Sequence, residues 1–527
     1  MKRRQFLKTT TATCVVAIAN PVSSLAIEEV EPKPSSAPQA FELDELTITE
    51  LQQGLQSGKY TSKKLVEKYH GRINNIDASG PTLRSVIEMN PDAEEIAVAL
   101  DRERKEKGPR GPLHGIPILI KDNIDTHDRM MTTAGSLALV GARPARDAAV
   151  AQKLREAGAV ILGKTNLSEW ANFRSTKSSS GWSARGGQTR NPYVLDRNPC
   201  GSSSGSGAAV AANLCAAAIG TETDGSIVCP SNANSLVGIK PTLGLVGGSG
   251  IIPIAHSQDT AGPMARTVAD AAILLGAIAQ NSNVDFTKSL DRNGLRGMRL
   301  GIARKHFGFN ERVDKLMNGL LEEMKRLGAV LIDPADIPTA GKFDESEFEV
   351  LLYEFKADLN AYLAGLGPTA PVRSLKDVIE FNEKNRDREM PYFGQDIMIK
   401  AQEKGPLTSK AYIQALRKNH LLTRSQGIDF VMKKNRLDAL VAPTGGPPWP
   451  TDWINGDHFT GGYSSASAVA GYPHITVPAG YIFGLPVGIS FFGGANSEAK
   501  LIKIAYAFEQ ATKARRVPKF LEHVDFT

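Results

Sequence analysis

Two segments of small residues near the middle of the chain have the composition that serine-based chemistry requires. The first reads C-G-S-S-S-G-S-G (200–207) and the second reads G-T-E-T-D-G-S-I (220–227). Serine supplies a hydroxyl nucleophile, and glycine lets the backbone approach a substrate closely. Gly/Ser runs are most often flexible linkers, but an alanine-rich stretch and an apolar run, 216–219, follow the first segment directly. Because linkers are not usually embedded in a core, we expect these segments to form a site.

Three kinds of chemistry use segments of this composition. A phosphate-binding loop needs a lysine after its last glycine, and none follows here. The α/β-hydrolase pattern Gly-x-Ser-x-Gly is satisfied by 201–205, with Ser203 as the nucleophile. That turn must leave a strand directly, whereas the preceding stretch, 190–199, is polar and contains two prolines. The third kind is a serine nucleophile that is activated by a lysine instead of a histidine.

The family resemblance described below implies that Lys121 is such a base. It follows G-I-P-I-L-I (115–120), an apolar run typical of a strand buried on both faces. An ammonium group cannot accept a proton, so Lys121 would have to be neutral when the reaction begins. Burial disfavours the charged form and lowers the pKa of lysine. A lone lysine after a strand usually lies on the surface, but the two serine segments favour the catalytic interpretation.

An α/β sheet is predicted to position these residues. A helix at 147–157 and a buried strand at 159–162 follow the strand that ends before Lys121, which gives a βαβ unit. Further strands are predicted at 300–303, 330–332, 439–442, 475–477 and 487–491, and further helices after a capping residue at 267, at 312–327 and at 498–511. We therefore predict a mixed, mostly parallel sheet with helices on both faces.

Residues 345–434 interrupt this alternation. They are rich in charge and in large apolar residues, and no strand is evident among them. We predict a helical insertion within one domain that spans 42–527, and we expect side chains that select the substrate to come from the insertion. Two arrangements remain open, because the insertion could cover the edge of the sheet or form a plain helical subdomain.

The N-terminus has the features of an export signal. An arginine pair at 3–4 precedes a weakly apolar run, 9–19, and a stretch of small residues at 24–26 offers a cleavage site. We predict a twin-arginine signal peptide over 1–26, a linker over 27–41, and a mature protein in the periplasm or outside the cell. A frayed basic N-terminus is the alternative.

Charge and composition exclude several classes of protein. The chain has 62 basic and 56 acidic residues, and four of the basic ones lie in the first 26 positions, so the remainder is nearly neutral. Nucleic-acid binding usually needs clustered positive charge, so no nucleic-acid partner is predicted. Since no apolar run reaches 18 residues, no membrane association is predicted after signal removal. No metal site is predicted, because no Cys or His pair has metal-ligand spacing.

The cysteines are too few for a disulfide scaffold. Cys14 lies in the predicted signal, which leaves Cys200, Cys215 and Cys229 in the mature chain and allows one disulfide at most. Cys229 follows Ser226 by three positions, and we predict that it is a small packing residue.

Taken together, these motifs resemble the amidase signature family. The similarity spans about 113–275 and returns at 484–493, and its most specific parts are the two serine segments, G-I-P-I-L-I-K-D-N, and the segment that begins at Gln258. Within the family, the chain is most similar to bacterial peptide amidases, through N-L-S-E-W-A-N-F-R (166–174) and G-T-E-T-D-G-S-I-V-C-P (220–230). The resemblance implies the amidase signature fold and a hydrolase that forms an acyl-enzyme without a cofactor.

The resemblance also implies a Ser–Ser–Lys triad. Ser226 would be the acylated nucleophile, and Lys121 would be the base. Ser202, which lies 24 residues before Ser226, would pass the proton to Lys121 and later to the leaving amine. In the family, this bridging serine follows a non-proline cis peptide, which here is Gly201–Ser202.

Other site residues are predicted around this triad. Backbone N–H groups that could form an oxyanion hole are those of Thr223, Asp224, Gly225 and Ser226. Asn172 could orient the substrate amide, although a purely structural hydrogen bond is an equal alternative. The chain departs from many family members at Asp224, where they have glycine, and at Val228, where they have arginine. Without that arginine a substrate carboxylate loses its partner, so we expect neutral acyl groups to be preferred.

We therefore predict an amide hydrolase, and the resemblance favours removal of the C-terminal amide of peptides with release of ammonia. An aryl or alkyl acylamidase of the same family is the alternative. An amidotransferase A-type subunit is less favoured, because its tRNA partner is cytoplasmic while this chain carries an export signal. A non-enzymatic binding module is the remaining alternative. We expect a monomer or a homodimer.

Overall fold

An 11-stranded mixed sheet organises the fold. The computed structural model describes residues 40–281, 284–367 and 370–526, which belong to a single unit. The signal peptide predicted at 1–26 and nearly all of the linker predicted at 27–41 lie outside the described residues. None of the described helices combines the length and the apolarity that a membrane span requires.

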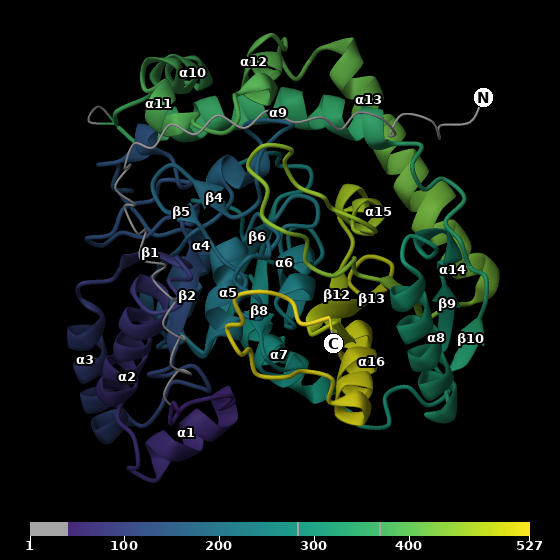
Figure 1. The fold of residues 1–527 in the computed structure, drawn as a ribbon, viewed down its shortest axis with the longest axis horizontal. Helices are drawn as coiled ribbons and strands as arrows, with labels where there is room; N and C mark the ends of the chain where they lie inside the picture. Colours follow the sequence, from purple (N-terminus) through teal and green to yellow (C-terminus); the bar gives the residue numbers. More distant parts are fainter. Residues whose placement is uncertain (1–39, 282–283, 368–369, 527) are drawn as a thin grey trace, which may run out of the picture. The chain divides into compact units, whose positions relative to one another are not determined.

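Each strand predicted from the sequence is present in this sheet. Its members are β1 (Val86–Met89), β2 (Pro117–Lys121), β3 (Val160–Thr165), β6 (Ala217–Glu222), β7 (Val237–Lys240), β8 (Thr260–Ala265), β9 (Arg299–Ile302), β10 (Val330–Ile332), β11 (Ala439–Pro443), β12 (His474–Ile482) and β13 (Leu485–Phe492). They lie in the order β1-β3-β2-β6-β8-β7-β12-β13-β11-β9-β10. Figure 1 shows β1 on one side of the body and β9 and β10 on the other. A separate small hairpin consists of β4 (Trp182–Ser183) and β5 (Gly187–Gln188).

The mixed sheet flanked by helices is confirmed, and its parallel pairs lie in two blocks. β3, β2 and β6 are mutually parallel on one side, and β11, β9 and β10 are parallel on the other. Between these blocks every neighbouring pair is antiparallel, partly because a tight hairpin joins β12 to β13. Fewer neighbouring strand pairs of the described sheet are therefore parallel than the sequence predicted.

Helices flank the sheet. Outside the insertion they are α1 (Ile48–Gln56), α2 (Ser62–Ile73), α3 (Ala93–Lys107), α4 (Ala149–Glu156), α5 (Ser204–Ala211), α6 (Val228–Ala233), α7 (Val268–Ile278), α8 (Glu311–Arg326), α15 (Ser465–Ala470) and α16 (Glu498–Thr512). Among them, α4, α5, α7, α8 and α16 lie where the sequence predicted helices. The hydroxyl of Thr267 accepts a hydrogen bond from the backbone N–H of Asp270 and so caps α7, as its sequence predicts.

The segment between β10 and β11 is helical. It contains α9 (Asp344–Gly365), α10 (Leu375–Lys384), α11 (Arg386–Glu389), α12 (Asp396–Gln402), α13 (Lys410–His420) and α14 (Asp429–Asn435). Figure 1 shows α9 to α13 in green along one side of the body. Phe355 of α9 packs on Phe173 with a ring-centroid distance of 5.0 Å, and the same apolar cluster includes Ile252 and Ile254. The insertion thus packs on loops that connect site-bearing strands.

The strands that carry the serine and lysine segments are fully enclosed. Every residue of β2, β3 and β6 is buried. Such strands need near-continuous apolar or small residues because both of their faces are covered. A polar side chain that is buried there needs a hydrogen-bond or charge partner. The polar residues at the ends of β2 and β6 are therefore the positions at which to look for a functional site.

Candidate active site

Lys121, the last residue of β2, reaches the serine segment that precedes α5. Its Nζ donates to the Oγ of Ser202 at 2.8 Å, to the Oγ1 of Thr221 at 2.8 Å and to the carbonyl oxygen of Thr221 at 3.3 Å. Lys121 and Ser202 are both completely buried. The structure therefore brings two of the predicted site residues into direct contact.

The environment of Lys121 favours a neutral amine. Burial lowers the pKa of Lys121 to about 7, and the negative charges of Asp259 and Glu222 oppose this shift only in part. With such a pKa, about half of the molecules carry the unprotonated amine at neutral pH. The neutral amine can accept a proton from Ser202, as a general base requires.

The Gly201–Ser202 peptide bond is cis, as the resemblance implies. Gly201 is tightly enclosed, because a Cβ atom there would clash with the Oγ of Ser168. The carbonyl oxygen of Ser202 accepts a hydrogen bond from the backbone N–H of Ser168 at 3.1 Å. These contacts hold Ser202 in place opposite Lys121.

Ser226 lies in a turn that follows β6. Its carbonyl oxygen accepts from the backbone N–H of Ser203 at 3.1 Å, which sets the turn directly beside the Ser202 segment. Its hydroxyl has no hydrogen-bond partner among the described residues, and Ser226 keeps 8% of its surface exposed. The side chains of Ser202 and Ser226 are not hydrogen-bonded to each other in the described chain. Ser226 thus carries a hydroxyl without a partner among the described residues, in a turn that is hydrogen-bonded to the Ser202 segment.

The turn around Ser226 is shaped by Glu222. One carboxylate oxygen of Glu222 accepts from the backbone N–H groups of Ile227 at 2.7 Å and Val228 at 3.0 Å. Gly225 has a φ of 81°, which favours glycine. Across the described residues, no protein acceptor binds the backbone N–H groups of Thr223, Asp224, Gly225 and Ser226. These four N–H groups therefore stay candidates for the predicted oxyanion hole.

The side chains of the predicted oxyanion turn have partners of their own. The Oγ1 of Thr223 donates to Asp259 at 2.6 Å. The carboxylate of Asp224 accepts from the hydroxyls of Ser464 and Ser465, which begin α15. Burial raises the pKa of Asp224. Asp224 is therefore held against α15, and only its backbone is available to a ligand at the turn.

Asn172 fits both roles that the sequence left open. Three consecutive residues, 170–172, have positive φ angles, so the chain turns sharply at this point. The amide nitrogen of Asn172 donates to the Oγ of Ser180 at 3.2 Å, which is a structural contact. Its Oδ1 is buried without a partner. Ala171, the preceding residue, lines the small cavity beside Ser202.

Ser203, the nucleophile of the α/β-hydrolase alternative, is occupied in the structure. Its Oγ donates to the carbonyl oxygen of Thr221 at 3.0 Å and accepts from the backbone N–H of Thr221 at 3.1 Å. The stretch before Gly201 is not a strand. The strand–serine–helix turn of that fold is therefore not present, and Ser203 binds α5 to β6.

The prediction that Cys229 is a small packing residue is wrong, because Cys229 forms a disulfide with Cys200. The bond joins the residue before Gly201 to α6, which begins two residues after Ser226. The two cysteines are 29 positions apart, so only the fold brings them together. Cys215 is free and buried. One covalent link thus fastens the two serine segments to each other.

Removing this link is expected to destabilise the protein. In a double variant, Cys200→Ser with Cys229→Ser, the free energy of unfolding should fall by about 3–4 kcal/mol, because the bond closes a loop of about 30 residues in the unfolded chain. Unfolding midpoints of wild type and double variant, each with and without reductant, measure the effect. The double variant is the control, since reductant should not change it. An unchanged wild-type midpoint under reduction would contradict the prediction.

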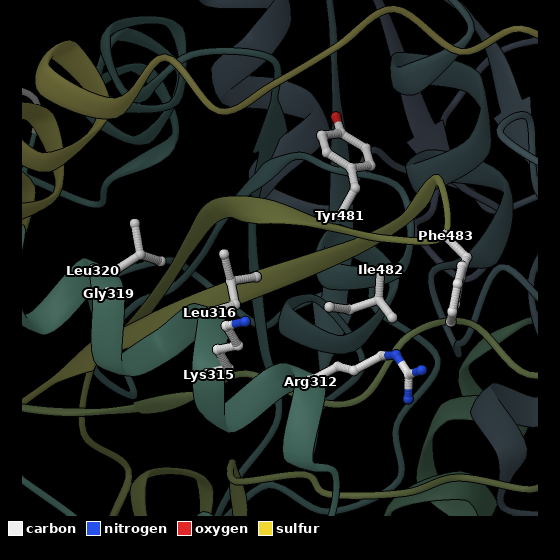
Figure 2. A pocket seen from close by; sticks show the side chains of 8 residues that line it. All are labelled: Arg312, Lys315, Leu316, Gly319, Leu320, Tyr481, Ile482 and Phe483. Atoms are coloured by element: carbon white, nitrogen blue, oxygen red, sulfur yellow. The ribbon is translucent and has the colours of Figure 1, made fainter. Parts of the chain in front are cut away.

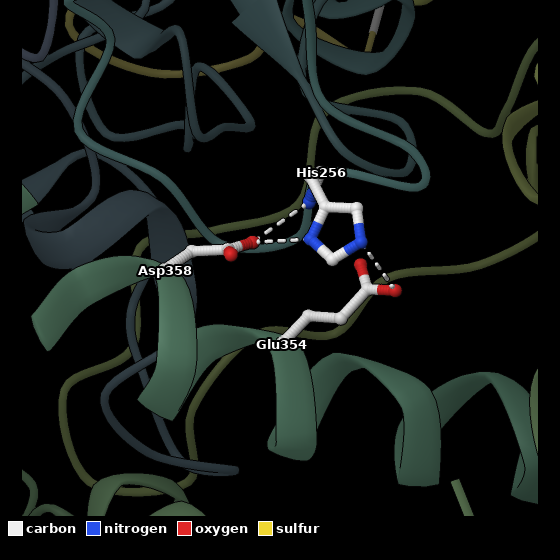
Figure 3. Close-up of side chains that lie close together, drawn as sticks. All are labelled: His256, Glu354 and Asp358. Carbon is white, nitrogen blue, oxygen red and sulfur yellow. Dashed lines mark hydrogen bonds and ion pairs between the residues drawn. The ribbon is translucent and has the colours of Figure 1, made fainter. Parts of the chain in front are cut away.

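His256, Glu354 and Asp358 form a cluster outside the serine and lysine segments, with ligand atoms within 4.8 Å of one another (Figure 3). The His256 ring lies between the two carboxylates, with its Nδ1 2.8 Å from Asp358 and its Nε2 3.5 Å from Glu354. Glu354 also accepts from the backbone N–H of Ser257 and from Tyr412. Because these atoms already bind one another, the cluster is an ion-pair network that ties the loop of His256 to α9.

Three residues of the site were not predicted from the sequence: Thr221, Glu222 and Asp259. Thr221 accepts from Lys121, and Asp259 binds Thr223 while lining the same small cavity as Ser202. A signal for Glu222 existed, since a carboxylate at the end of a buried strand must have a partner. The partner is the backbone of a turn, which residue types alone do not reveal.

Comparisons with known proteins identify the family and the fold. The family model described as Amidase matches residues 64–502. The native peptide amidase from Stenotrophomonas maltophilia is 50% identical and has a TM-score of 0.87, covering 92% of this chain and 100% of its own. A probable amidase of Arabidopsis thaliana is 44% identical over 91% of this chain and 93% of its own length. The A-type subunit of the glutamyl-tRNA(Gln) amidotransferase from Halorhodospira halophila is 32% identical, covering 90% of this chain and 99% of its own length. This chain belongs to the amidase signature family and is an amide-hydrolysing enzyme.

Proposed function

We propose that the enzyme removes the C-terminal amide of peptides and releases ammonia, through an acyl-enzyme on Ser226. The observation that carries the catalytic part is the 2.8 Å contact between the buried Nζ of Lys121 and the Oγ of Ser202. A lysine whose charged form is disfavoured by burial can act as a base, and here its hydrogen-bond partner is a second serine.

Acylation follows from this arrangement. Neutral Lys121 takes the proton of Ser202, and Ser202 takes the proton of Ser226 as the Ser226 Oγ attacks the amide carbon. The negative charge that develops on the carbonyl oxygen is stabilised by the free N–H donors of the turn, of which each typically contributes about 10²–10³ in rate. The proton then passes back through Ser202 to the amide nitrogen, the C–N bond breaks, and ammonia leaves.

Deacylation repeats these proton movements with water as the nucleophile. Water attacks the acyl carbon, and its proton passes through Ser202 to Lys121. The C–O bond to Ser226 then breaks, Ser226 regains a proton, and a free carboxylic acid leaves. The overall reaction consumes one water and one amide, and it gives one acid and one ammonia.

The peptide part of the proposal is supported by the likeness to a peptide amidase and by Asn172. A peptide offers amide N–H groups near the scissile bond, and the buried, unpaired Oδ1 of Asn172 could accept one of them. An aryl or alkyl acylamidase is the alternative within the family. The likeness to the A-type component of an amidotransferase keeps a partnered role as a second alternative, and co-purification with another protein chain would favour it.

The first test is ammonia release from a capped dipeptide amide. Wild type should release ammonia, and Ser226→Ala should lower kcat by about 10⁴–10⁶-fold, because the acyl-enzyme cannot form. Ser203→Ala is the matched control in the same segment, and we expect it to stay within about tenfold of wild type since it loses only hydrogen bonds to the backbone. Equal activity of wild type and Ser226→Ala would assign the nucleophile elsewhere. Turnover of aryl or alkyl amides alone would refute the peptide assignment.

We also propose that the enzyme is exported. The Cys200–Cys229 disulfide supports an oxidising location, because such bonds are rare in the reducing cytosol. Expression in a bacterium with a twin-arginine pathway should give periplasmic protein whose N-terminus lies near residue 27. Replacing both arginines of the 3–4 pair by lysine is the control and should retain the protein in the cytoplasm. Periplasmic protein that still begins at Met1 would contradict cleavage.

A further inference from the structure

The loop that joins β11 to α15 is built around the serine segments. We call residues 446–462 the tryptophan loop. Its two ends are closed by a hydrogen bond from the backbone N–H of Gly446 to the carbonyl oxygen of Thr460, 2.9 Å long. Asn232 of α6 donates to the carbonyl oxygen of Gly446 at 3.0 Å, and Ser464, just after the loop, binds Asp224. The ends of the loop therefore flank the turn that carries Ser226.

The tryptophan loop is anchored at several points. Trp449 packs with Cys200 and Cys229 in one apolar cluster. Asp457 accepts from the indole N–H of Trp449 at 3.2 Å and from the backbone N–H of Ser180 at 3.0 Å. The position of Ser180 is itself close to the site, because a Cβ atom on Gly201 would lie 3.4 Å from its Cβ. These contacts fix the loop on the residues that precede Ser202.

Several apolar side chains of the tryptophan loop are exposed to solvent. Ile454 is 94% exposed, Phe459 49% and Trp453 44%. The Trp453 ring stacks on Tyr392 of the insertion at 4.6 Å, and Tyr392 is itself 42% exposed. The Phe459 ring meets Trp449 edge-on at 5.7 Å. Several exposed aromatic and aliphatic groups on one anchored loop are typical of binding surfaces.

We infer that the tryptophan loop, together with Tyr392, binds the peptide chain on the acyl side of the scissile amide and selects apolar residues there. This inference rests on the proposed function. Since the leaving group is ammonia, all of the remaining peptide lies on one side of the scissile bond and must extend away from Ser226. The loop supplies an apolar surface that is continuous with the site through Trp449. Val228 offers no cationic partner to an acidic acyl group.

A second apolar surface serves as a comparison. A groove with a volume of about 550 Å³ lies between α8 and the β12–β13 hairpin, and its walls include Leu316, Ile482 and Phe483 (Figure 2). Arg312 lies over the Phe483 ring at 4.9 Å. No contact of these side chains with the serine segments is present among the described residues. Phe483→Ser therefore removes a comparable exposed aromatic group away from the site.

The test compares a long and a short substrate in a loop variant, Ile454→Ser with Phe459→Ser. Both substitutions keep the hydrogen bonds of Asp457 that anchor the loop, although Phe459→Ser also removes the ring contact with Trp449. For a capped tetrapeptide amide with Leu and Phe upstream of the amide, we expect KM to rise about tenfold, with kcat within twofold of wild type. For N-acetyl-alanine amide, and for Phe483→Ser with both substrates, the constants should stay unchanged. An unchanged KM for the long substrate, or an equal loss for both substrates, would overturn the inference.

A binding measurement separates this inference from the proposed reaction. In the Ser226→Ala background, calorimetric titration with the tetrapeptide amide reports affinity without turnover. We expect the two loop substitutions to weaken binding about tenfold there. Equal affinity with and without them, or no binding at all, would overturn the inference. Binding that depends on the loop, combined with a wild type that releases no ammonia from peptide amides, would refute the proposed function alone.

Discussion

Replacing Lys121 by methionine is expected to lower kcat by about 10⁴-fold or more, the loss seen when one member of a serine triad is removed. Methionine keeps the length of the buried side chain but cannot accept a proton from Ser202. In wild type, kcat/KM should rise with pH through about 7, because only the neutral amine is a base and the pKa of Lys121 is lowered to that value by burial. Initial rates between pH 5 and 9 measure both effects.

Asp259 provides the control for this assignment. It is buried, and burial raises the pKa of its carboxyl to about 6, so it also titrates near neutral pH. In Asp259→Asn, the rise near pH 7 should remain and move to lower pH, because Asp259 stabilises the charged form of Lys121. A residual activity in Lys121→Met that still rises through pH 7 would assign the rise to another group. Unfolding midpoints of both variants establish that the fold is retained.

Lys121 and Ser202 were identified through the resemblance to the amidase signature family, because the motifs that carry that resemblance are short and local. A lysine that ends an apolar strand and a serine in a Gly/Ser run are both local features, and the sheet then brings them to 2.8 Å. The disulfide between Cys200 and Cys229 could not be found in this way. It depends on how β6 and α6 return past the first segment, which spacing does not encode. Contacts made by side chains with the backbone, such as those of Glu222, are equally non-local.

In the fold, too, local features could be predicted from the sequence and long-range pairing could not. β2 and β3, the two strands of the predicted βαβ unit, are parallel, as a helical connection between them requires. Their burial could be predicted because each contains an apolar run. The order of the central strands depends on pairing between segments far apart in the chain, as when β12 joins β7 to β13. Strands joined by a hairpin and strands joined by a long connection have similar residue patterns. The sequence therefore did not predict whether neighbouring central strands are parallel or antiparallel. The insertion was recognised from its composition, whereas its packing on Phe173 was not.

Arg174 holds the insertion to the site-bearing loops, and replacing it is expected to have the largest effect on stability. It is completely buried with Glu169 on one side and Glu389 of α11 on the other. Its guanidinium donates to Glu169, to the carbonyl oxygen of Glu389 at 2.5 Å and to that of Phe393 at 3.3 Å. Burial raises the pKa of Glu169 well above its ordinary value, and Arg174 counteracts that shift.

In Arg174→Met, two buried carboxyl groups and two carbonyl oxygens lose their shared donor, which typically costs about 3–5 kcal/mol. The loss should be largest in the 386–402 stretch, because Arg174 binds Glu389 and Phe393 of the insertion there. Hydrogen exchange of amides in that stretch should therefore accelerate by about 10²–10³-fold, while amides of α8 keep their wild-type rates. Arg326→Met, which removes an exposed pair with Glu323, is the matched control and should leave exchange unchanged. Equal protection of 386–402 in wild type and Arg174→Met would mean that apolar packing alone fixes the insertion.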